Sequence, residues 1–370
     1  MNEFDFVRAR SPEHAVQLMS AVHEDAAVRT APRYLAGGTN VVDLWREGVM
    51  QPRSMVDISR LRLADITDGP DGGIRLGALA TNAATANHPL VRSRLPLLRS
   101  AILAGASPQI RNRATNGGNL LQRTRCLYFY DTQVPCNKRE LGSGCPAVHG
   151  LARQHAILGA SDVCVATHPS DMCVALAALD ATVAVIGPDG LRAIPFDELH
   201  RLPGDRPDLD TTLDPAELIT HIDIPANRWR ANSCYLKLRE RASYAFALVS
   251  VAAALDLNDD GTIADARVAL GGVAHKPWRN RDAERLLVGQ RPSSEAFGRC
   301  AARILDDARA CGGAEVPGAP PGNSFKIPLA ARAIVRALEM ALAGVATNTG
   351  EDAFRALGAA SASLSQGAAR

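Results

Sequence analysis

The stretch Ser107–Cys145 reads SPQIRNRATNGGNLLQRTRCLYFYDTQVPCNKRELGSGC and brings a glycine pair close to several cysteines. The glycines lie in Asn116-Gly117-Gly118-Asn119, and adjacent glycines allow backbone N–H groups to approach a phosphate closely. Cysteine thiolates are the usual ligands of iron–sulfur clusters. Three cysteines follow the glycines within the same stretch: Cys126, Cys136 and Cys145. The stretch therefore predicts a flavin nucleotide beside an iron–sulfur cluster.

The composition of the chain excludes several classes of protein. Its 370 residues suffice for two or three domains, and 41 basic against 39 acidic residues leave a net charge of only +2. This charge balance does not indicate a basic surface for nucleic acid. The aromatic content of only 4% does not indicate a stacking platform for single strands. No stretch predicts a membrane span, and the acidic first residues do not resemble a signal peptide. We expect either a cytoplasmic protein or a periplasmic one that is exported together with a partner subunit.

The hydrophobic pattern alternates between short strands and helices, which predicts an α+β fold. The expected strands cover residues 34–36, 54–57, 74–79, 163–167, 182–186, 218–224, 233–238, 250–257 and 263–270. The expected helices cover residues 12–22, 41–49, 95–105, 171–179, 282–287, 294–310 and 327–342, and Thr81 is expected to cap a further helix.

The domain boundary is expected at Pro225-Ala226-Asn227, where a proline follows the last strand of the first half. We therefore expect a first domain over residues 1–226 and a second over residues 230–345. The first would carry a loop insertion at about 122–164, because this segment has no sustained hydrophobic period. Residues 346–370, rich in Ala, Ser and Gly, are expected to form a flexible tail.

A second glycine pair, in Gly37-Gly38-Thr39-Asn40, lies between an expected strand and an expected helix. Two such turns can hold one pyrophosphate from two sides, whereas the alternative is that both are tight turns without a ligand. Asp171 begins an expected helix, where it either bonds a ribityl hydroxyl or serves only as a helix-starting residue. Lys237 lies in an expected strand and either reaches the flavin or faces solvent.

The spacing of the cysteines favours an iron–sulfur cluster over a zinc site. No CxxC pair, the usual zinc pattern, joins Cys126, Cys136 and Cys145, and wide gaps suit a loop that surrounds a cubane cluster. Cys164 is either a fourth ligand or an ordinary buried residue of a strand. The cations Lys138-Arg139 would offset the negative charge of a thiolate-ligated cluster.

These motifs resemble the flavin subunit of the xanthine dehydrogenase family of molybdenum hydroxylases. AGGTN at 36–40 looks like the first FAD loop of that family, and Ile110-Arg111-Asn112 with Thr115–Asn119 looks like the second. The resemblance continues to Gly271-Gly272-Val273-Ala274 in the C-terminal part. It implies FAD contacts from Leu35, Ala36, Gly37, Gly38, Thr39, Asn40, Ile110, Arg111, Thr115, Asn116, Gly117, Gly118, Asn119, Asp171 and Lys237.

The cysteine insertion narrows this resemblance, because most members of the family lack it. Comparable insertions occur in the flavin subunits of bacterial periplasmic aldehyde oxidoreductases and of 4-hydroxybenzoyl-CoA reductase. RCLYFYD and CNKRELGSGC look closer to the aldehyde oxidoreductase branch, which implies a 4Fe-4S cluster with Cys164 as its fourth ligand. The implied fold is a two-subdomain FAD-binding domain of the vanillyl-alcohol oxidase type, followed by an α+β domain of the CO dehydrogenase flavoprotein C-terminal type.

The resemblance also implies a role as an electron-transfer subunit of a heterotrimer. A large molybdopterin-binding subunit would oxidise an aldehyde, and a small 2Fe-2S subunit would relay the electrons. This chain would pass them through FAD to an external acceptor, and we recognise no nucleophile–base constellation on it. Two alternatives stay open: a flavin subunit of the 4-hydroxybenzoyl-CoA reductase or xanthine dehydrogenase type, and, from another class, a non-catalytic zinc-binding protein.

Overall fold

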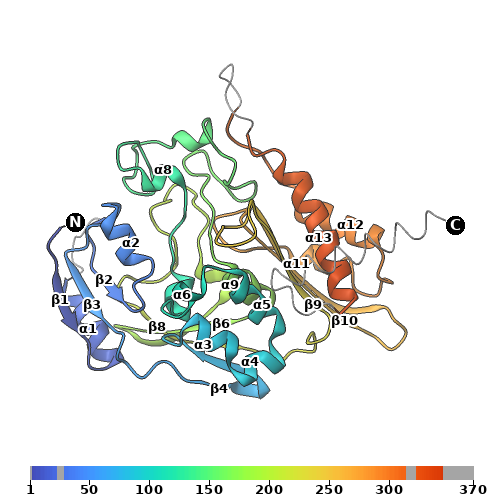
Figure 1. The fold of residues 1–370 in the computed structure, drawn as a ribbon, viewed down its shortest axis with the longest axis horizontal. Coiled ribbons are helices and arrows are strands. Elements are labelled where there is room, and N and C mark those ends of the chain that lie inside the picture. The colour runs from blue at the N-terminus through green and yellow to red at the C-terminus, as the bar shows by residue number, and fades with distance from the viewer. Residues whose placement is uncertain (1, 23–28, 314–321, 345–370) are drawn as a thin grey trace.

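The computed structural model describes residues 2–22, 29–313 and 322–344, which form three β-sheets with helices packed against them (Figure 1). This mixed content confirms the predicted α+β class. The elements of the N-terminal half lie on one side of the molecule, and the C-terminal sheet and its helices lie on the other (Figure 1). None of the helices in these ranges has the length and apolarity that crossing a membrane requires. The expected tail at 346–370 lies outside the described residues.

The first sheet is parallel and small, with the strand order β1-β3-β2. Its strands are β1 (Asp5–Arg8), β2 (Arg33–Leu35) and β3 (Ser54–Asp57), and its helices are α1 (Pro12–Val22) and α2 (Val41–Arg46). Helix α1 begins where predicted, since the Ser11 hydroxyl accepts the His14 backbone N–H at 3.1 Å. Helix α2 is shorter than predicted because Gly48, with a φ of 71°, turns the chain away.

The second sheet has five antiparallel strands in the order β4-β5-β8-β6-β7. These are β4 (Ile66–Asp68), β5 (Ile74–Gly77), β6 (Thr182–Gly187), β7 (Gly190–Pro195) and β8 (Leu218–Ile224). The helices α3 (Asn82–Asn87), α4 (Pro89–Arg94), α5 (Pro96–Ala104) and α9 (Asp171–Ala178) share its apolar core. Thr81 caps α3 as predicted, by accepting the Ala84 N–H. Every residue of α9 is buried.

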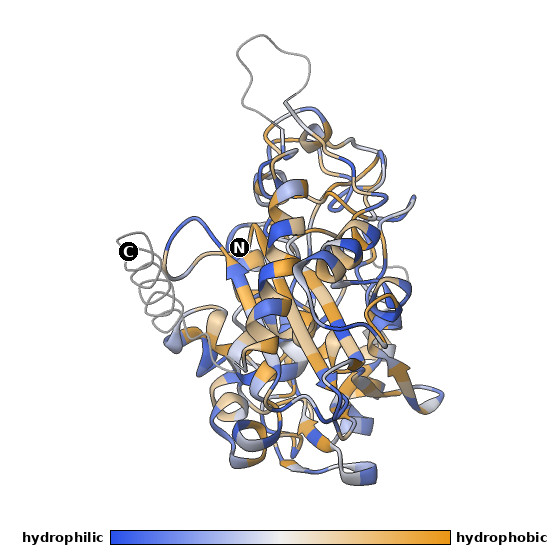
Figure 2. Ribbon diagram, turned by 90° about the vertical axis from the view of Figure 1, so that its right-hand side faces the viewer, coloured by the Kyte–Doolittle hydropathy of each residue, from blue (hydrophilic) through white to orange (hydrophobic). Residues whose placement is uncertain are grey.

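The third sheet is antiparallel, with the order β12-β11-β10-β9. Its strands are β9 (Ser233–Leu238), β10 (Val249–Leu257), β11 (Ile263–Gly271) and β12 (Trp278–Arg279), and the helices are α11 (Arg281–Arg285), α12 (Ser294–Ile304) and α13 (Lys326–Leu342). Figure 2 shows hydrophilic and hydrophobic residues alternating along the helices of this side. Helix α13 accordingly buries only one face, including Ile334 and Leu338, in the core of this sheet.

The segment 121–170 contains little regular structure. Four short helices lie in the connections between strands of the second sheet. These are α6 (Pro108–Arg111), α7 (Asn116–Leu120) and α8 (Leu127–Tyr130) between β5 and β6, and α10 (Phe196–Leu199) between β7 and β8. The strand predicted at 163–167 is wrong, since only a single bridge joins Ser161 to Cys164. Its backbone groups bind the loop instead of a sheet: the Val163 carbonyl accepts from the Asn137 side chain, and the Val165 carbonyl from the Ala156 N–H.

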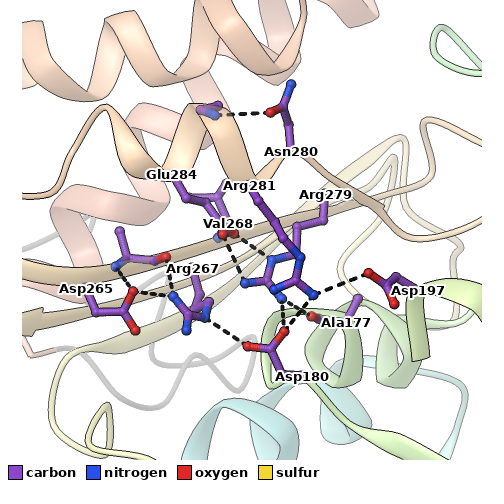
Figure 3. A network of polar contacts seen from close by, with 12 residues as sticks. Ala177, Asp180, Asp197, Asp265, Arg267, Val268, Arg279, Asn280, Arg281 and Glu284 are labelled. Carbon is purple, nitrogen blue, oxygen red and sulfur yellow. Dashed lines mark hydrogen bonds and ion pairs between the residues drawn. The ribbon is translucent and has the colours of Figure 1, made fainter. Parts of the chain in front are cut away.

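A buried ion network joins the N-terminal half to the third sheet (Figure 3). The Arg279 guanidinium donates to both oxygens of Glu284, at 2.7 and 3.0 Å, within the C-terminal half. It also donates to Asp180 at 2.6 Å and to the Ala177 carbonyl at 2.8 Å, at the end of α9. Arg281 adds a 2.9 Å ion pair to Asp180. The residues that follow α9 are therefore fixed to the third sheet by charge as well as by packing.

We expect Arg279→Leu to lower the free energy of unfolding by about 3 kcal/mol, because Glu284 would keep a buried charge without its cation. The Arg279 and Glu284 side chains are only 5% and 6% exposed. Urea unfolding measures the change, and Arg299→Leu is the matched control. The pair of Arg299 with Glu295 is exposed and should contribute less than about 1 kcal/mol. Equal losses in both variants would contradict a special role for Arg279.

Candidate functional site

The first glycine turn packs against the chain that leads into the second glycine turn. The first, Gly37–Asn40, connects β2 to α2, and the second lies at the start of α7. A Cβ on Gly37 would lie 2.0 Å from the Arg113 carbonyl oxygen, so only glycine permits this approach. Gly38 has a φ of 77°, which L side chains rarely adopt. Both glycines thus have a structural requirement of their own, and together they bring the two turns to one place.

Two cavities meet at these turns. The turn cavity, of about 400 Å³, lies along the first turn and Thr115. The helix cavity, of about 450 Å³, lies at the start of α9 and beside α6. Thr39, Asn40 and Gly118 line both cavities, so the two spaces adjoin at the glycine turns. An elongated ligand that extends from one cavity into the other past the glycine turns fits this arrangement. Both volumes lie in the usual range of ligand sites.

Most of the residues predicted to contact the nucleotide line these cavities. The turn cavity is lined by Ala36, Gly37, Gly38, Thr39, Asn40, Thr115, Gly117 and Gly118. The helix cavity is lined by Thr39, Asn40, Ile110, Arg111, Gly118, Asn119, Asp171 and Lys237. Leu35 and Asn116 line neither. Asn116 is fully buried, and its amide donates to the Gly77 carbonyl at 3.1 Å, so it connects α7 to β5.

Asp171 is held by two side chains from the third sheet. Its carboxylate accepts the Tyr235 hydroxyl at 2.7 Å and the Lys237 ammonium at 2.7 Å. The Lys237 ammonium also donates to the Ala104 carbonyl at the end of α5, at 3.1 Å. Lys237 therefore does not face solvent, and its charge is balanced by Asp171. Burial, together with the Asp171 charge, raises the pKa of Tyr235 well above its usual range.

The four predicted cysteine ligands come together in one small pocket, the cysteine pocket, which is lined by Cys126, Cys136, Cys145 and Cys164. Burial raises the pKa of the Cys126 thiol to about 11. The side chains of Cys145 and Cys164 interact, and this contact lowers the pKa of Cys145 and raises that of Cys164. The two thiols therefore titrate as a pair, and a thiolate is the form that binds metal.

Two histidines that the sequence did not single out contact the sulfurs. His155 Nε2 lies 3.0 Å from Cys126 Sγ, and His275 Nε2 lies 3.3 Å from Cys164 Sγ. Burial lowers the pKa of both imidazoles, to about 4 for His155, so each is neutral at pH 7 and has one N–H to donate. The 111 residues between His275 and Cys164 explain why no local motif predicts this contact.

The loop that carries the cysteines is held by its own polar side chains. Arg139 donates to the carbonyls of Tyr128 and Phe129, at 2.5 and 2.7 Å. The Lys138 ammonium lines the cysteine pocket and binds Asp210 at 2.6 Å. Arg123 pairs with the same carboxylate, so the three groups together keep one positive charge beside the cysteines. Although burial raises the pKa of Asp210, the cations Arg123 and Lys138 hold it well below its usual range.

Residues 2–227 match the family described as the FAD binding domain in molybdopterin dehydrogenase. The chain belongs to this flavoprotein family. Residues 234–317 match the CO dehydrogenase flavoprotein C-terminal domain. These matches confirm the resemblance inferred from the glycine turns, and they confirm FAD as the nucleotide that the family binds. The predicted pairing of an FAD-binding domain with a CO dehydrogenase type C-terminal domain is confirmed as well.

Several members of the molybdopterin dehydrogenase flavoprotein family are similar to this chain. The aldehyde oxidoreductase FAD-binding subunit PaoB of Escherichia coli strain K12 is 44% identical over 78% of this chain and 86% of its own length. The carbon monoxide dehydrogenase medium chain of Afipia carboxidovorans is 25% identical over 77% of this chain and 80% of its own length.

Among solved structures, reconstituted CO dehydrogenase from Oligotropha carboxidovorans matches with a TM-score of 0.70 and 23% identity, covering 93% of this chain and 99% of that one. Quinoline 2-oxidoreductase from Pseudomonas putida 86 matches with a TM-score of 0.67, 20% identity and coverage of 93% and 98%. At these identities the two structures support the fold alone.

The cavities of this family member fit FAD. The buried Asn40 amide nitrogen has no hydrogen-bond partner within the described chain, and Asn40 lines both cavities. A buried donor without a partner is costly, and a ligand oxygen would satisfy it. In the second turn the N–H groups of residues 116–119 already donate to protein oxygens, that of Gly118 to the Thr115 hydroxyl at 3.2 Å. The small glycines of this turn would therefore make room for a ligand rather than donate to it.

We expect Tyr235→Phe to lower the free energy of unfolding by about 2 kcal/mol, because the buried Asp171 carboxylate would lose one of its two side-chain donors. Thermal unfolding of the protein stripped of its flavin measures this without contributions from the ligand. Tyr244→Phe, at a position that is 56% exposed, is the control and should change stability by less than about 0.5 kcal/mol. If both variants unfold like the wild type, the Tyr235 bond does not support Asp171.

Proposed function

We propose that this chain is the FAD- and 4Fe-4S-binding electron-transfer subunit of a heterotrimeric, molybdenum-dependent aldehyde oxidoreductase. Its partners would be a large molybdopterin-binding subunit and a small 2Fe-2S subunit, and it would deliver electrons to an external acceptor. The 44% identity to an aldehyde oxidoreductase FAD-binding subunit supports this assignment. In this proposal residues 1–226 form the FAD-binding domain with its cluster insertion, and residues 230–345 form the C-terminal domain.

The observation that carries the proposal is that all four cysteines of the insertion region line one pocket. A tetrahedral zinc ion with Zn–S bonds of about 2.3 Å needs its sulfurs about 3.8 Å apart. Within the described chain, no three of these sulfurs lie within 4.8 Å of one another. A cubane binds one thiolate at each of its four irons, and four cysteines around one pocket can supply them. The imidazoles of His155 and His275 can each donate an N–H to a ligand sulfur.

The proposed FAD contacts divide between the two cavities. Ala36–Asn40, Thr115 and Gly117-Gly118 would surround the pyrophosphate, since all of them line the turn cavity. The backbone N–H groups of the first turn would donate to it, whereas those of Gly117 and Gly118 are already bonded within the protein. Asp171 would accept a hydroxyl of the ribityl chain from the helix cavity. Lys237 would hold the Asp171 carboxylate in position rather than contact the flavin itself, because its ammonium is already bonded to that carboxylate. Bound FAD accepts electrons singly and releases them in pairs, and the protein fixes its orientation and environment.

We expect Cys136→Ser to remove iron and sulfide from the purified protein while most of the FAD remains, because the cysteine pocket and the FAD cavities have different walls. Iron, sulfide, zinc and flavin assays measure the outcome. Cys300→Ser, in the core of α12, is the matched control and should keep all cofactors. Cys164→Ser tests the fourth ligand in the same way.

Two results would overturn the cluster proposal. One is wild-type iron content in Cys136→Ser, and the other is zinc without flavin in the unaltered protein. Turnover of aldehydes by the purified complex separates the proposed activity from those of the 4-hydroxybenzoyl-CoA reductase and xanthine dehydrogenase types.

We expect Gly118→Val to weaken FAD binding at least about tenfold, or about 1.4 kcal/mol, because Gly118 lines both cavities. The ratio of flavin to protein after purification, and titration of the stripped protein with FAD, measure the effect. Gly298→Val is the control: it also places valine in a helix, and a Cβ there meets nothing within 4 Å. Full flavin occupancy in Gly118→Val would mean that the pyrophosphate does not lie at this turn.

A further inference from the structure

A third cavity, of about 460 Å³, lies between the helix cavity and the cysteine pocket; we call it the side cavity. It shares Arg125, Ser170, Asp171 and Phe246, among others, with the helix cavity. On its other side it is lined by Cys126 and His155, which belong to the cysteine group. A molecule in the side cavity would therefore lie next to both proposed redox groups.

The side cavity is largely apolar and has an apolar rim. Leu127, Leu151 and Phe246 line it and are nevertheless 49%, 50% and 44% exposed. Large apolar side chains that are exposed together around a cavity are typical of a ligand site. Gly271 and Gly272, at the end of β11, also line the cavity.

The charges that line the side cavity are all balanced by partners. Arg125 forms an ion pair with Asp43 at 2.6 Å, and Arg153 forms one with Glu240 at 2.5 Å. Asp171 is paired with Lys237 at 2.7 Å. No cation among the lining residues in the described chain is left to bind a phosphate, which argues against a dinucleotide and for an uncharged ligand. The Nε of Arg125 and the Nδ1 of His155 are buried without partners among the described residues, so the cavity wall offers a few polar groups as well.

We propose that the side cavity binds a neutral, planar quinone, which serves as the electron acceptor of this subunit. This inference rests on the proposed function, which supplies the electrons. A quinone gains two electrons and two protons to become a hydroquinone. A fully reduced flavin loses two electrons and two protons when it is oxidised, so the two reactions balance. The apolar walls hold the ring, and the Arg125 Nε–H is suited to donate to a quinone oxygen.

The test is equilibrium dialysis of naphthoquinone against the complex purified with its cofactors, together with steady-state turnover. Leu151→Trp and Leu127→Trp add bulk to the cavity wall and should raise both the Kd and the KM for naphthoquinone about tenfold. Turnover with ferricyanide, FAD content and iron content should stay at the wild-type level. Leu141→Trp is the matched control, because Leu141 lies on the same loop and is also 50% exposed but does not line the cavity. Naphthoquinone sulfonate, which carries a negative charge, should bind the wild type about tenfold more weakly than the neutral compound.

Several outcomes overturn the inference. An unchanged Kd in both tryptophan variants means that quinone binds elsewhere, and competition by a nicotinamide dinucleotide means that the site is built for a phosphate. Loss of FAD in the tryptophan variants means that the flavin itself occupies this space. FAD-containing protein that does not bind naphthoquinone overturns the inference alone, whereas a preparation without FAD and iron overturns the proposed function.

Discussion

The burial of α9 is the constraint on which the arrangement of the molecule depends. All eight residues of this helix are buried, and their side chains pack in one core with residues of the second sheet and of β9, β10 and β11. At its start Asp171 meets Tyr235 and Lys237 of the third sheet, and beyond its end Asp180 meets Arg279. One short helix therefore fixes the two halves of the chain at both of its ends, and its first residue, Asp171, lines the helix cavity.

The cysteine loop is held in place through the element that follows the first glycine turn. Leu44, from α2, packs in one apolar cluster with Phe129 and Cys136 of the loop. Asp43, on the same helix, binds both Arg125 and the Tyr130 hydroxyl. The helix that begins at a proposed pyrophosphate turn thus supports the loop that carries the cysteines. The two proposed cofactor sites therefore share one structural support, α2.

The sequence predicted the features that are encoded locally. Helix starts such as Ser11-Pro12, the two glycine turns and the clustered cysteines each carry their signal within a few residues. The strand at 163–167 was wrong because its apolar pattern is shared by a buried loop whose backbone is bonded to side chains. The sequence did not predict the roles of Tyr235 and His275. Nothing in the residues next to a buried tyrosine or histidine identifies the distant side chain that it contacts. Lys237 was found, but its pairing with Asp171 depends on the folded arrangement.

The contact of Gly37 with the Arg113 carbonyl has a consequence for the order of events during folding. The two turns are far apart along the chain, so this contact closes a long stretch of it. Contacts of such long sequence separation form late, since closing the intervening chain costs entropy before it yields contacts. The turn cavity therefore exists only in a chain that has closed this long-range contact. FAD at this place would need the tertiary arrangement of the whole half rather than a local turn.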